Sequence, residues 1–207
     1  ANLWLRCAGR VFVKMGEFKA TSFEELFQGT KALPWGDWIP VDGKFTVVGK
    51  SVKSTLHSVP DCQAIVKKAI VEKLKEKYDV DWFDETGAEY TVQVALLKDM
   101  ATLTIDTSGS GLHKRGYRAN ALDAPLKETL AAAMVELSYW NKDRILLDPF
   151  CGSGTIPIEA ALIARNIAPG LNRHFASEKW ERVPESLWKE ERRKCYEAID
   201  YDCMPEI

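Results

Sequence analysis

The sequence lacks the features by which secreted, membrane-spanning and zinc-stabilised proteins are recognised. Its five cysteines are an odd number without a C-x-x-C pair, so neither a disulfide framework nor a metal site is expected. No run of about 18 apolar residues occurs. The chain also begins without the charged, apolar and small-residue order of a signal peptide. We therefore expect a cytoplasmic protein without a membrane segment.

An excess of one charge is missing as well. The 28 Lys and Arg residues nearly balance 30 Asp and Glu residues, which leaves a formal charge of -2. A chain with this balance does not coat nucleic acid over its whole surface, so an anionic partner must be met by a local basic patch. With 46% hydrophobic and 28% charged residues in 207, we expect an ordinary folded chain of two modest domains.

Residues of the first half alternate or recur in patterns typical of an α+β unit. A capping box formed by Ser22 and Glu25 precedes a predicted helix over about 23–32. Pro60 opens a second predicted helix that runs to about Tyr78, with apolar residues at helical spacing. Alternating apolar residues predict strands over 10–14, 44–51, 90–96 and 101–105, the last two as a hairpin.

The stretch Thr107–Gly111 consists of small residues without periodicity, so we place a domain boundary there, between residues 110 and 111. Beyond it, a helix is predicted, followed by a strand over 144–148 and a helix from Thr155 to about Asn166. Helix, strand, glycine turn and helix are the opening of a doubly wound sheet. The first of these helices is predicted from the helical spacing of Leu126, Leu130, Met134 and Leu137.

The glycine turn between Asp148 and Thr155 is the most informative stretch. In open α/β sheets the ligand binds where a strand ends, and glycine lets it approach the backbone. No lysine completes a P-loop, and Pro157 stands where a dinucleotide fingerprint needs its third glycine. A tight turn without a ligand is the alternative interpretation.

The remaining pattern, D-x-x-x-G-x-G, resembles motif I of the S-adenosylmethionine-dependent methyltransferases. The form Asp-Pro-Phe-x-Gly-Ser-Gly-Thr resembles enzymes that methylate amines of nucleic-acid bases. The resemblance implies S-adenosylmethionine as cofactor, with the glycines beside its methionine part and the acid fixing its amino group. The implied cofactor-binding residues are Asp148, Pro149, Phe150, Cys151, Gly152, Ser153, Gly154 and Thr155.

Further stretches resemble the THUMP-containing RNA methyltransferases over essentially the whole chain. Residues 111–118 and 124–127 are similar to the junction before the methyltransferase domain, and residues 49–54 and 58–63 to the THUMP core. The similarity is to the bacterial branch that methylates the exocyclic amine of guanine in large-subunit ribosomal RNA. It implies a THUMP-type α+β RNA-binding domain over 1–110, including a ferredoxin-like remnant. Residues 111–207 are then the opening part of a doubly wound, Rossmann-like methyltransferase domain.

Basic residues gather in two places that fit an RNA-binding role. Between Gly49 and Lys77 seven lysines face three acids, so this stretch can neutralise phosphates. For the helix lysines, such as Lys67 and Lys68, a solvated helix face is the alternative. The second cluster precedes the glycine turn, and a flexible basic linker is its alternative. The predicted RNA-binding residues are Lys50, Ser51, Lys53, Ser54, His113, Lys114, Arg115 and Arg118.

The chain resembles a fragment lacking both ends. It starts with Ala1 in an apolar pattern, and only 63 residues run from Ile145 to Ile207, too few for a complete doubly wound sheet. The family's ribose-binding acid and Asn/Asp-Pro-Pro-Tyr motif are expected beyond Ile207, so no catalytic residue is assigned. Two alternatives stay open: a non-catalytic RNA-binding module with a vestigial glycine loop, and a DNA adenine methylase.

Overall fold

A computed structural model describes residues 1–118 and 125–207, so Ala124 of the similar junction lies outside the described residues. The chain divides into two compact units. The sheet unit comprises Phe12–Gly109 and Lys179–Arg182. The helical unit comprises Ala1–Val11, Ser110–Glu178 and Val183–Ile207. The division after Gly109 is one residue from the expected boundary, but the first eleven residues group with the second half.

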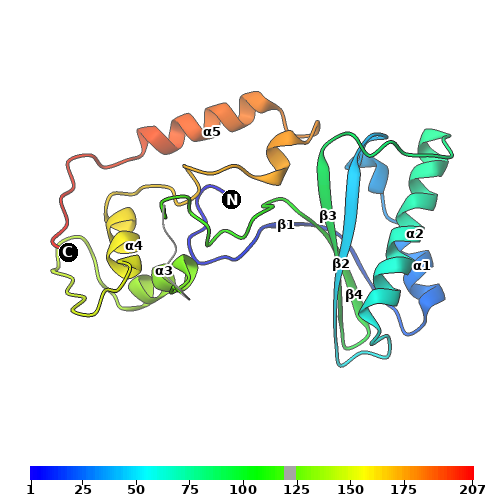
Figure 1. Ribbon diagram of the computed structural model, residues 1–207, viewed down its shortest axis with the longest axis horizontal. Coiled ribbons are helices and arrows are strands. Elements are labelled where there is room, and N and C mark those ends of the chain that lie inside the picture. The colour runs from blue at the N-terminus through cyan, green and yellow to red at the C-terminus, as the bar shows by residue number, and fades with distance from the viewer. Residues whose placement is uncertain (119–124) are drawn as a thin grey trace. The chain divides into compact units, whose positions relative to one another are not determined.

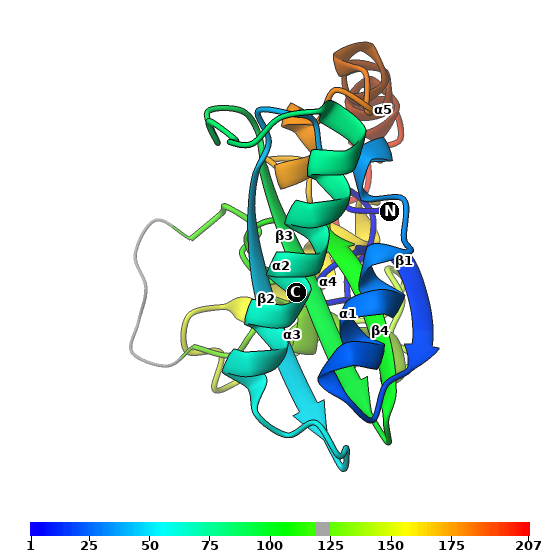
Figure 2. The ribbon, with the colours of Figure 1, turned by 90° about the vertical axis from the view of Figure 1, so that its right-hand side faces the viewer.

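The sheet unit contains one four-stranded sheet (Figure 1), whose strands lie in the order β1-β4-β3-β2 (Figure 2). β2 and β3 are parallel, whereas β4 runs antiparallel to both of its neighbours. The predicted alternation is confirmed, because residues of β3 and β4 are buried and partly exposed in turn. The strands are β1 (Phe12–Lys19), β2 (Lys44–Val52), β3 (Glu89–Leu97) and β4 (Met100–Asp106).

Two helices, α1 (Phe23–Lys31) and α2 (Val59–Tyr78), cover one face of this sheet (Figure 2). The predicted capping box is present, since the Ser22 side chain accepts from Glu25 N and the Glu25 carboxylate accepts from Ser22 N. A short 3-10 helix, η1 (Trp35–Asp37), follows α1. Both predicted helices of the first half are confirmed within one residue at each end.

The segment Lys179–Arg182 packs within the sheet unit although it comes from the second half of the sequence. The ring of Trp180 is buried and stacks on Tyr90, with ring centroids 4.9 Å apart. The guanidinium of Arg182 lies 4.6 Å from the ring centroid of Trp38. Aromatic stacking and cation–π contact therefore attach these four residues to the sheet unit.

The helical unit holds α3 (Glu128–Leu137), α4 (Thr155–Ala164) and α5 (Glu185–Glu197), and the 3-10 helix η2 (Ala176–Lys179) begins in it. Its hydrophobic core joins the first residues of the chain to the second half. Gly170 N donates to Leu3 O at 2.9 Å, and Leu112 N donates to Gly9 O at 2.8 Å. The buried core residues are Leu3, Leu112, Ala168, Leu171, Phe175 and Cys195. Across the described part of the chain, no helix is long and apolar enough to span a bilayer.

The predicted strand over 144–148 is wrong for this structure, in which those residues form no strand. A strand needs a neighbour that accepts and donates its ladder hydrogen bonds. Leu146 N donates one hydrogen bond, to Glu206 O at 3.0 Å, and one bond does not make a ladder. Ile145 and Leu147 consequently remain 74% and 83% exposed.

The helix predicted from Leu126, Leu130, Met134 and Leu137 is present as α3, but these residues do not form its buried face. Ala131, Ala132 and Val135 are buried, whereas Leu130 and Leu137 are 53% and 78% exposed. The small side chains allow close packing between α3 and α4, and the larger apolar residues lie on the opposite side. The predicted helix is therefore confirmed, and its buried face is the one that carries the small residues.

Candidate functional site

The glycine turn between Asp148 and α4 forms a hollow of about 310 Å³ within the helical unit. Pro125 and Leu126, which precede α3, contribute to its wall. Of the eight residues predicted at this site, Pro149 and Gly154 belong to the same turn but not to the lining. The other six line the hollow: Asp148, Phe150, Cys151, Gly152, Ser153 and Thr155.

Gly152 and Gly154 give the turn its shape. Both adopt left-handed backbone angles, with φ of +54° and +72°, which side-chain-bearing residues rarely adopt. A Cβ placed on Gly152 would meet no atom within 4 Å, and one on Gly154 would meet Ile158 at an ordinary 3.6 Å. Backbone conformation therefore favours glycine here, and the open space beside the turn is available to a ligand.

Two groups give the hollow opposite electrostatic preferences. The Asp148 carboxylate lines it, with Oδ1 accepting from Phe150 N at 3.3 Å. α4 begins immediately after Gly154, and no side chain caps the N-terminus of this helix with a hydrogen bond. A helix N-terminus favours an anionic group and a carboxylate favours a cationic one. The turn therefore suits a ligand that carries both charges, such as an amino-acid head group.

Arg118 lies beside this hollow and not on a free surface. Its guanidinium donates to Thr155 Oγ1 and to Leu126 O, the latter at 3.1 Å. Its Nε lies 3.4 Å from Glu128 Oε1 at the start of α3. Arg118 thereby connects the first residue of α4 with the segment that enters α3. The sequence shows no spacing signal for this contact between distant residues.

Arg115 does not fit its predicted RNA-binding role, because it is buried in an ion pair with Glu159 of α4. Arg115 Nε lies 3.3 Å from Glu159 Oε1, and the two side chains are 2% and 0% exposed. Tyr117 donates its hydroxyl to the same carboxylate at 3.1 Å. Burial, together with the Glu159 charge, raises the pKa of Tyr117. Arg115 therefore stabilises the helical unit from inside.

A second hollow, of about 410 Å³, carries the remaining basic residues of this stretch. Lys114 and Lys127 line it and are exposed, as basic groups that contact a phosphate must be. His113 also lines it, and burial lowers the pKa of its imidazole. Arg118 extends from this hollow toward Thr155. Lys127 is not among the predicted RNA-binding residues, since it stands apart from the basic cluster in sequence.

Arg173 holds the junction before this hollow, so the alternative of a flexible basic linker does not fit the structure. The Arg173 guanidinium donates to the carbonyl oxygens of Ser110, Gly111 and Lys114 at 2.6, 2.6 and 2.9 Å. Three hydrogen bonds from one buried side chain fix the path of the backbone there.

In the sheet unit, the predicted residues at the end of β2 and just after it divide into two kinds. The side chains of Lys50 and Lys53 are exposed. The hydroxyls of Ser51 and Ser54 instead donate to Leu56 O at 2.7 Å and Val52 O at 3.1 Å. The lysines are thus available to a partner, whereas the serine hydroxyls already shape the loop.

The lysines of α2 fit the alternative interpretation. Lys67 Nζ lies 5.6 Å from the ring centroid of Phe45, and Lys68 Nζ lies 5.7 Å from that of Phe27. Side chains of this kind cover an apolar surface while their charged ends stay in water. These two lysines therefore belong to an ordinary solvated helix face.

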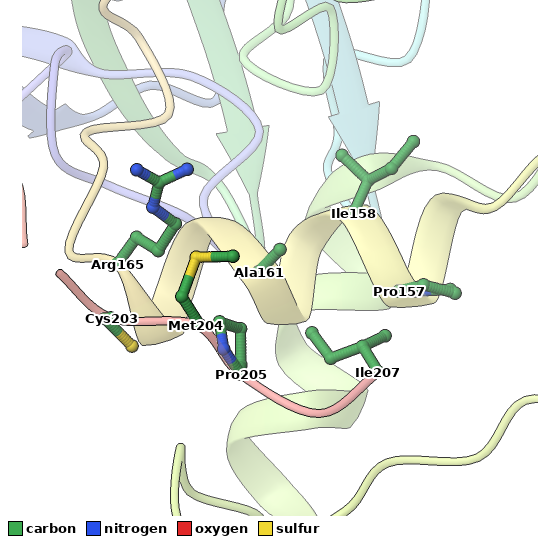
Figure 3. Close-up of a pocket in the computed structure, with 8 residues that line it drawn as sticks. All are labelled: Pro157, Ile158, Ala161, Arg165, Cys203, Met204, Pro205 and Ile207. Atoms are coloured by element: carbon green, nitrogen blue, oxygen red, sulfur yellow. The ribbon is translucent and has the colours of Figure 1, made fainter. Parts of the chain in front are cut away.

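An apolar hollow of about 350 Å³ separates α4 from the last residues of the chain (Figure 3). Ile158 and Ala161 of α4 line it together with Met204 and Ile207, and Arg165 contributes a charged side chain to the lining. A lining of this composition offers few groups to orient a polar ligand. We therefore assign no chemistry to it.

Comparison with known families separates the chain into two matched regions. Residues 20–106 match the THUMP domain, and residues 115–204 match the family described as "RMKL-like, methyltransferase domain". "Putative RNA methyltransferase YpsC" of Bacillus subtilis is 61% identical over 204 residues, which cover 98% of this chain and 53% of the relative. "Ribosomal RNA large subunit methyltransferase K/L" of Psychromonas ingrahamii is 39% identical over 189 residues, covering 90% of this chain and 25% of the relative. The chain thus spans about half or less of these relatives.

Two solved structures have the same fold over the whole chain. A "predicted N6-adenine-specific DNA methylase" from Listeria monocytogenes is 59% identical, with a TM-score of 0.96. SMU.472, described as "a putative methyltransferase complexed with SAH", is 49% identical, with a TM-score of 0.93. Each alignment covers 100% of this chain and 55% of the other. The expected fold class, a THUMP domain followed by part of a Rossmann-like methyltransferase domain, is confirmed.

Proposed function

We propose that the chain, whose residues 20–106 match a THUMP domain and whose residues 115–204 match an RMKL-like methyltransferase domain, serves RNA methylation dependent on S-adenosylmethionine. The observation that carries this proposal is the hollow at the glycine turn, with its carboxylate, its two left-handed glycines and its helix N-terminus. The similarity to a structure described as complexed with SAH supports the same cofactor.

The residues of the turn fit the methionine part of the cofactor. Asp148 would bind the cationic amino group, and the N-terminus of α4 would favour the carboxylate. Gly152 and Gly154 leave the backbone open to close approach. S-adenosylmethionine supplies an electrophilic methyl group on its sulfonium centre. The role of this chain is to hold that group in a defined position beside the RNA.

RNA would be bound by exposed basic residues of both units. We place one contact at the second hollow, where Lys114 and Lys127 offer two ammonium groups to a phosphate. Lys50 and Lys53 offer another in the sheet unit. Arg118 would position the turn through Thr155 instead of binding RNA as a free side chain. In this proposal residues 1–110, apart from the first eleven, mainly recognise RNA. Residues 111–207 mainly hold the cofactor.

For the target we propose an exocyclic amine, with guanine of large-subunit ribosomal RNA as the first candidate. The relative named for large-subunit ribosomal RNA and the resemblance of residues 49–54 support this choice. The base must leave its stack to reach the methyl group. Asn/Asp-Pro-Pro-Tyr does not occur in the 207 residues, so we assign no residue of this chain to holding the amine.

The experiment uses the complete natural polypeptide that carries this sequence. It is incubated with S-adenosylmethionine labelled in its methyl group and, in parallel, with ribosomal RNA, transfer RNA or duplex DNA. Methylated nucleosides are then identified by mass spectrometry. N2-methylguanosine in ribosomal RNA supports the full proposal. Methyladenine formed only in DNA would overturn it in favour of a DNA methylase, and absence of S-adenosylhomocysteine binding would favour a vestigial loop.

A further inference from the structure

The sheet has one face that neither α1 nor α2 covers. The register of the strands places Val52 beside Leu97 and Leu97 beside Met100, at one end of that face. These three side chains are 50%, 55% and 39% exposed. They form a continuous apolar row across neighbouring strands, here called the open-face row. Exposed apolar residues that adjoin one another are unusual on a soluble domain and typical of an interaction surface.

Side-chain direction confirms which face this is. A Cβ on Gly49 would meet Val59 and Gln63 of α2, so Gly49 points to the helices. Because successive residues of a strand point to opposite faces, Lys50 and Val52 lie on the same side and away from α2. In β1, Lys19 pairs with Met100 and continues the row across the sheet.

Four exposed lysines surround the open-face row. Lys19 and Lys50 stand on the open face itself. Lys53 and Lys98 follow directly after β2 and β3, both with left-handed backbone angles. We call this set, Lys19, Lys50, Lys53 and Lys98, the strand-end lysines.

Asp99 holds the segments that carry these lysines. Its Oδ1 accepts from Thr55 N at 2.6 Å, and its own N donates to Ser54 Oγ at 3.1 Å. Its carbonyl oxygen accepts from Ala20 N at 2.8 Å. Asp99 thus bonds to residues that follow closely after Lys19 and Lys53, and it adjoins Lys98 in the chain. The fold therefore fixes the backbone near these lysines, so their clustering does not depend on flexible side chains alone.

Several other lysines of this unit are paired with acids, although among the described residues Lys67, Lys68 and Lys75 of α2 form no salt bridge. Salt bridges join Lys14 to Glu17, Lys31 to Glu76, Lys44 to Glu89 and Lys77 to Asp37.

Within the described ranges, no strand-end lysine lies within salt-bridge distance of a carboxylate. Nearby acids serve elsewhere, since Glu25 caps α1, Glu17 pairs with Lys14, and Asp99 binds backbone. These acids therefore leave the strand-end lysines without a direct ion pair, and Glu25 interacts with Lys19 only over a longer distance.

We propose that the open-face row binds a single-stranded stretch of RNA, with base faces against the row and phosphates at the strand-end lysines. Single-stranded RNA presents flat, weakly polar bases beside regularly repeated negative charges, which is the complement of this surface. The row contains no aromatic ring, so binding depends on apolar area and charge and tolerates different sequences. This inference rests on the proposed RNA substrate and adds a surface distinct from the hollow at Lys114.

The test uses the 207-residue chain and a fluorescent oligouridine of about ten nucleotides, with affinity measured by anisotropy at several salt concentrations. Lys19→Gln combined with Lys98→Gln should weaken binding about tenfold and flatten the salt slope by about 0.7 for each phosphate that is no longer neutralised. Leu97→Ser combined with Met100→Ser should weaken binding comparably without changing the slope. Lys67→Gln combined with Lys68→Gln, on α2, is the matched control and should change neither quantity.

Circular dichroism checks that each variant is folded. Equal effects of the α2 control and the strand-end pair, or an unchanged affinity after both apolar substitutions, would overturn the proposal. Vesicles of anionic phospholipid form a second arm, and stronger binding to them than to RNA through Leu97 would assign the surface to a membrane instead. Loss of RNA binding only in Lys114→Gln combined with Lys127→Gln would remove this surface but leave the proposed function intact. No RNA binding by the unaltered chain would contradict both.

Discussion

Arg115 and Glu159 form a buried ion pair between the basic junction and α4, with Nε 3.3 Å from Oε1 and Nη2 3.4 Å from Oε2. Arg115 also donates to the carbonyl oxygens of Leu112 and Arg6. Because α4 begins at the glycine turn, one ion pair connects the N-terminal segment, the junction and the helix that borders the proposed cofactor site. The basic residue that sequence alone would assign to RNA thus stabilises the site from within.

Removal of one partner of this pair should be costly. Glu159→Gln leaves the Arg115 guanidinium buried without its counter-charge, so we expect a loss of about 3–5 kcal/mol in the free energy of unfolding. Urea denaturation followed by circular dichroism measures it. The control is Glu197→Gln, which breaks the exposed pair with Arg193 and should cost at most about 0.5 kcal/mol. Replacement of both buried partners by methionine should restore much of the loss, and equal losses in all variants would contradict this account.

The sheet unit could be predicted from sequence because its patterns are satisfied within the unit. Ser22 and Glu25 form their cap between neighbours, and the alternation of β3 and β4 is buried by α2 from the same stretch of chain. The helical unit differs. Ile145 and Leu147 have the composition of a strand, but a strand exists only with a paired neighbour, and the described residues supply a single hydrogen bond.

The candidate site shows the same division between local and distant information. The glycine turn can be recognised because its residues are contiguous and the left-handed angles of Gly152 and Gly154 favour glycine. Arg118 and Thr155 are 37 residues apart, and no periodicity links them. The choice between two apolar faces of α3 likewise depends on α4, whose small residues accept the alanine side. Tertiary packing decides such pairings, and one sequence does not encode them as a pattern.

Trp180 should contribute strongly to the stability of the sheet unit. Its indole is 2% exposed, stacks on Tyr90 and donates Nε1 to Glu89 O at 3.2 Å. Trp180→Ala removes a large buried side chain and leaves a cavity, so we expect a loss of about 3–5 kcal/mol. Thermal and urea unfolding measure the change. Trp82, which is 80% exposed, offers a matched control whose replacement by alanine should have little effect. Similar losses in the two variants would refute a packing role for Trp180.

Cys7 should react slowly with alkylating reagents in spite of its surface position. Partial desolvation of the thiol, together with the hydrogen bond from its Sγ to Glu136 Oε2 at 3.2 Å, raises the pKa of Cys7 to about 11. A raised pKa means fewer thiolates, roughly one in a thousand at pH 8, and the thiolate is the reactive form. Glu136→Gln removes the negative charge, lowers the pKa and should accelerate alkylation. Iodoacetamide labelling followed by peptide mass spectrometry measures the rate, with Cys151 as the internal control. An unchanged rate at Cys7 would show that Glu136 does not govern it.

The glycine turn allows ligand binding to be separated from backbone strain. Asp148→Ala removes a charge-assisted hydrogen bond worth about 1.5–3 kcal/mol, so the affinity for S-adenosylhomocysteine should fall roughly ten- to a hundredfold. The fold should survive, and Asp143→Ala, an exposed acid outside the hollow, should leave the affinity unchanged.

Substitution of the glycines should act through both conformation and access. Gly154→Val forces a branched side chain into a left-handed angle and narrows the space beside the turn, so it should lower both stability and affinity. Gly152→Ala meets no protein atom within 4 Å, so any loss of affinity beyond its loss of stability reports the ligand itself. Calorimetric titration of the complete natural polypeptide measures affinity, and circular dichroism measures stability. If Asp148→Ala and both glycine variants bound S-adenosylhomocysteine as tightly as the unaltered protein, the turn would be structural only and the proposed function would lose the observation that carries it.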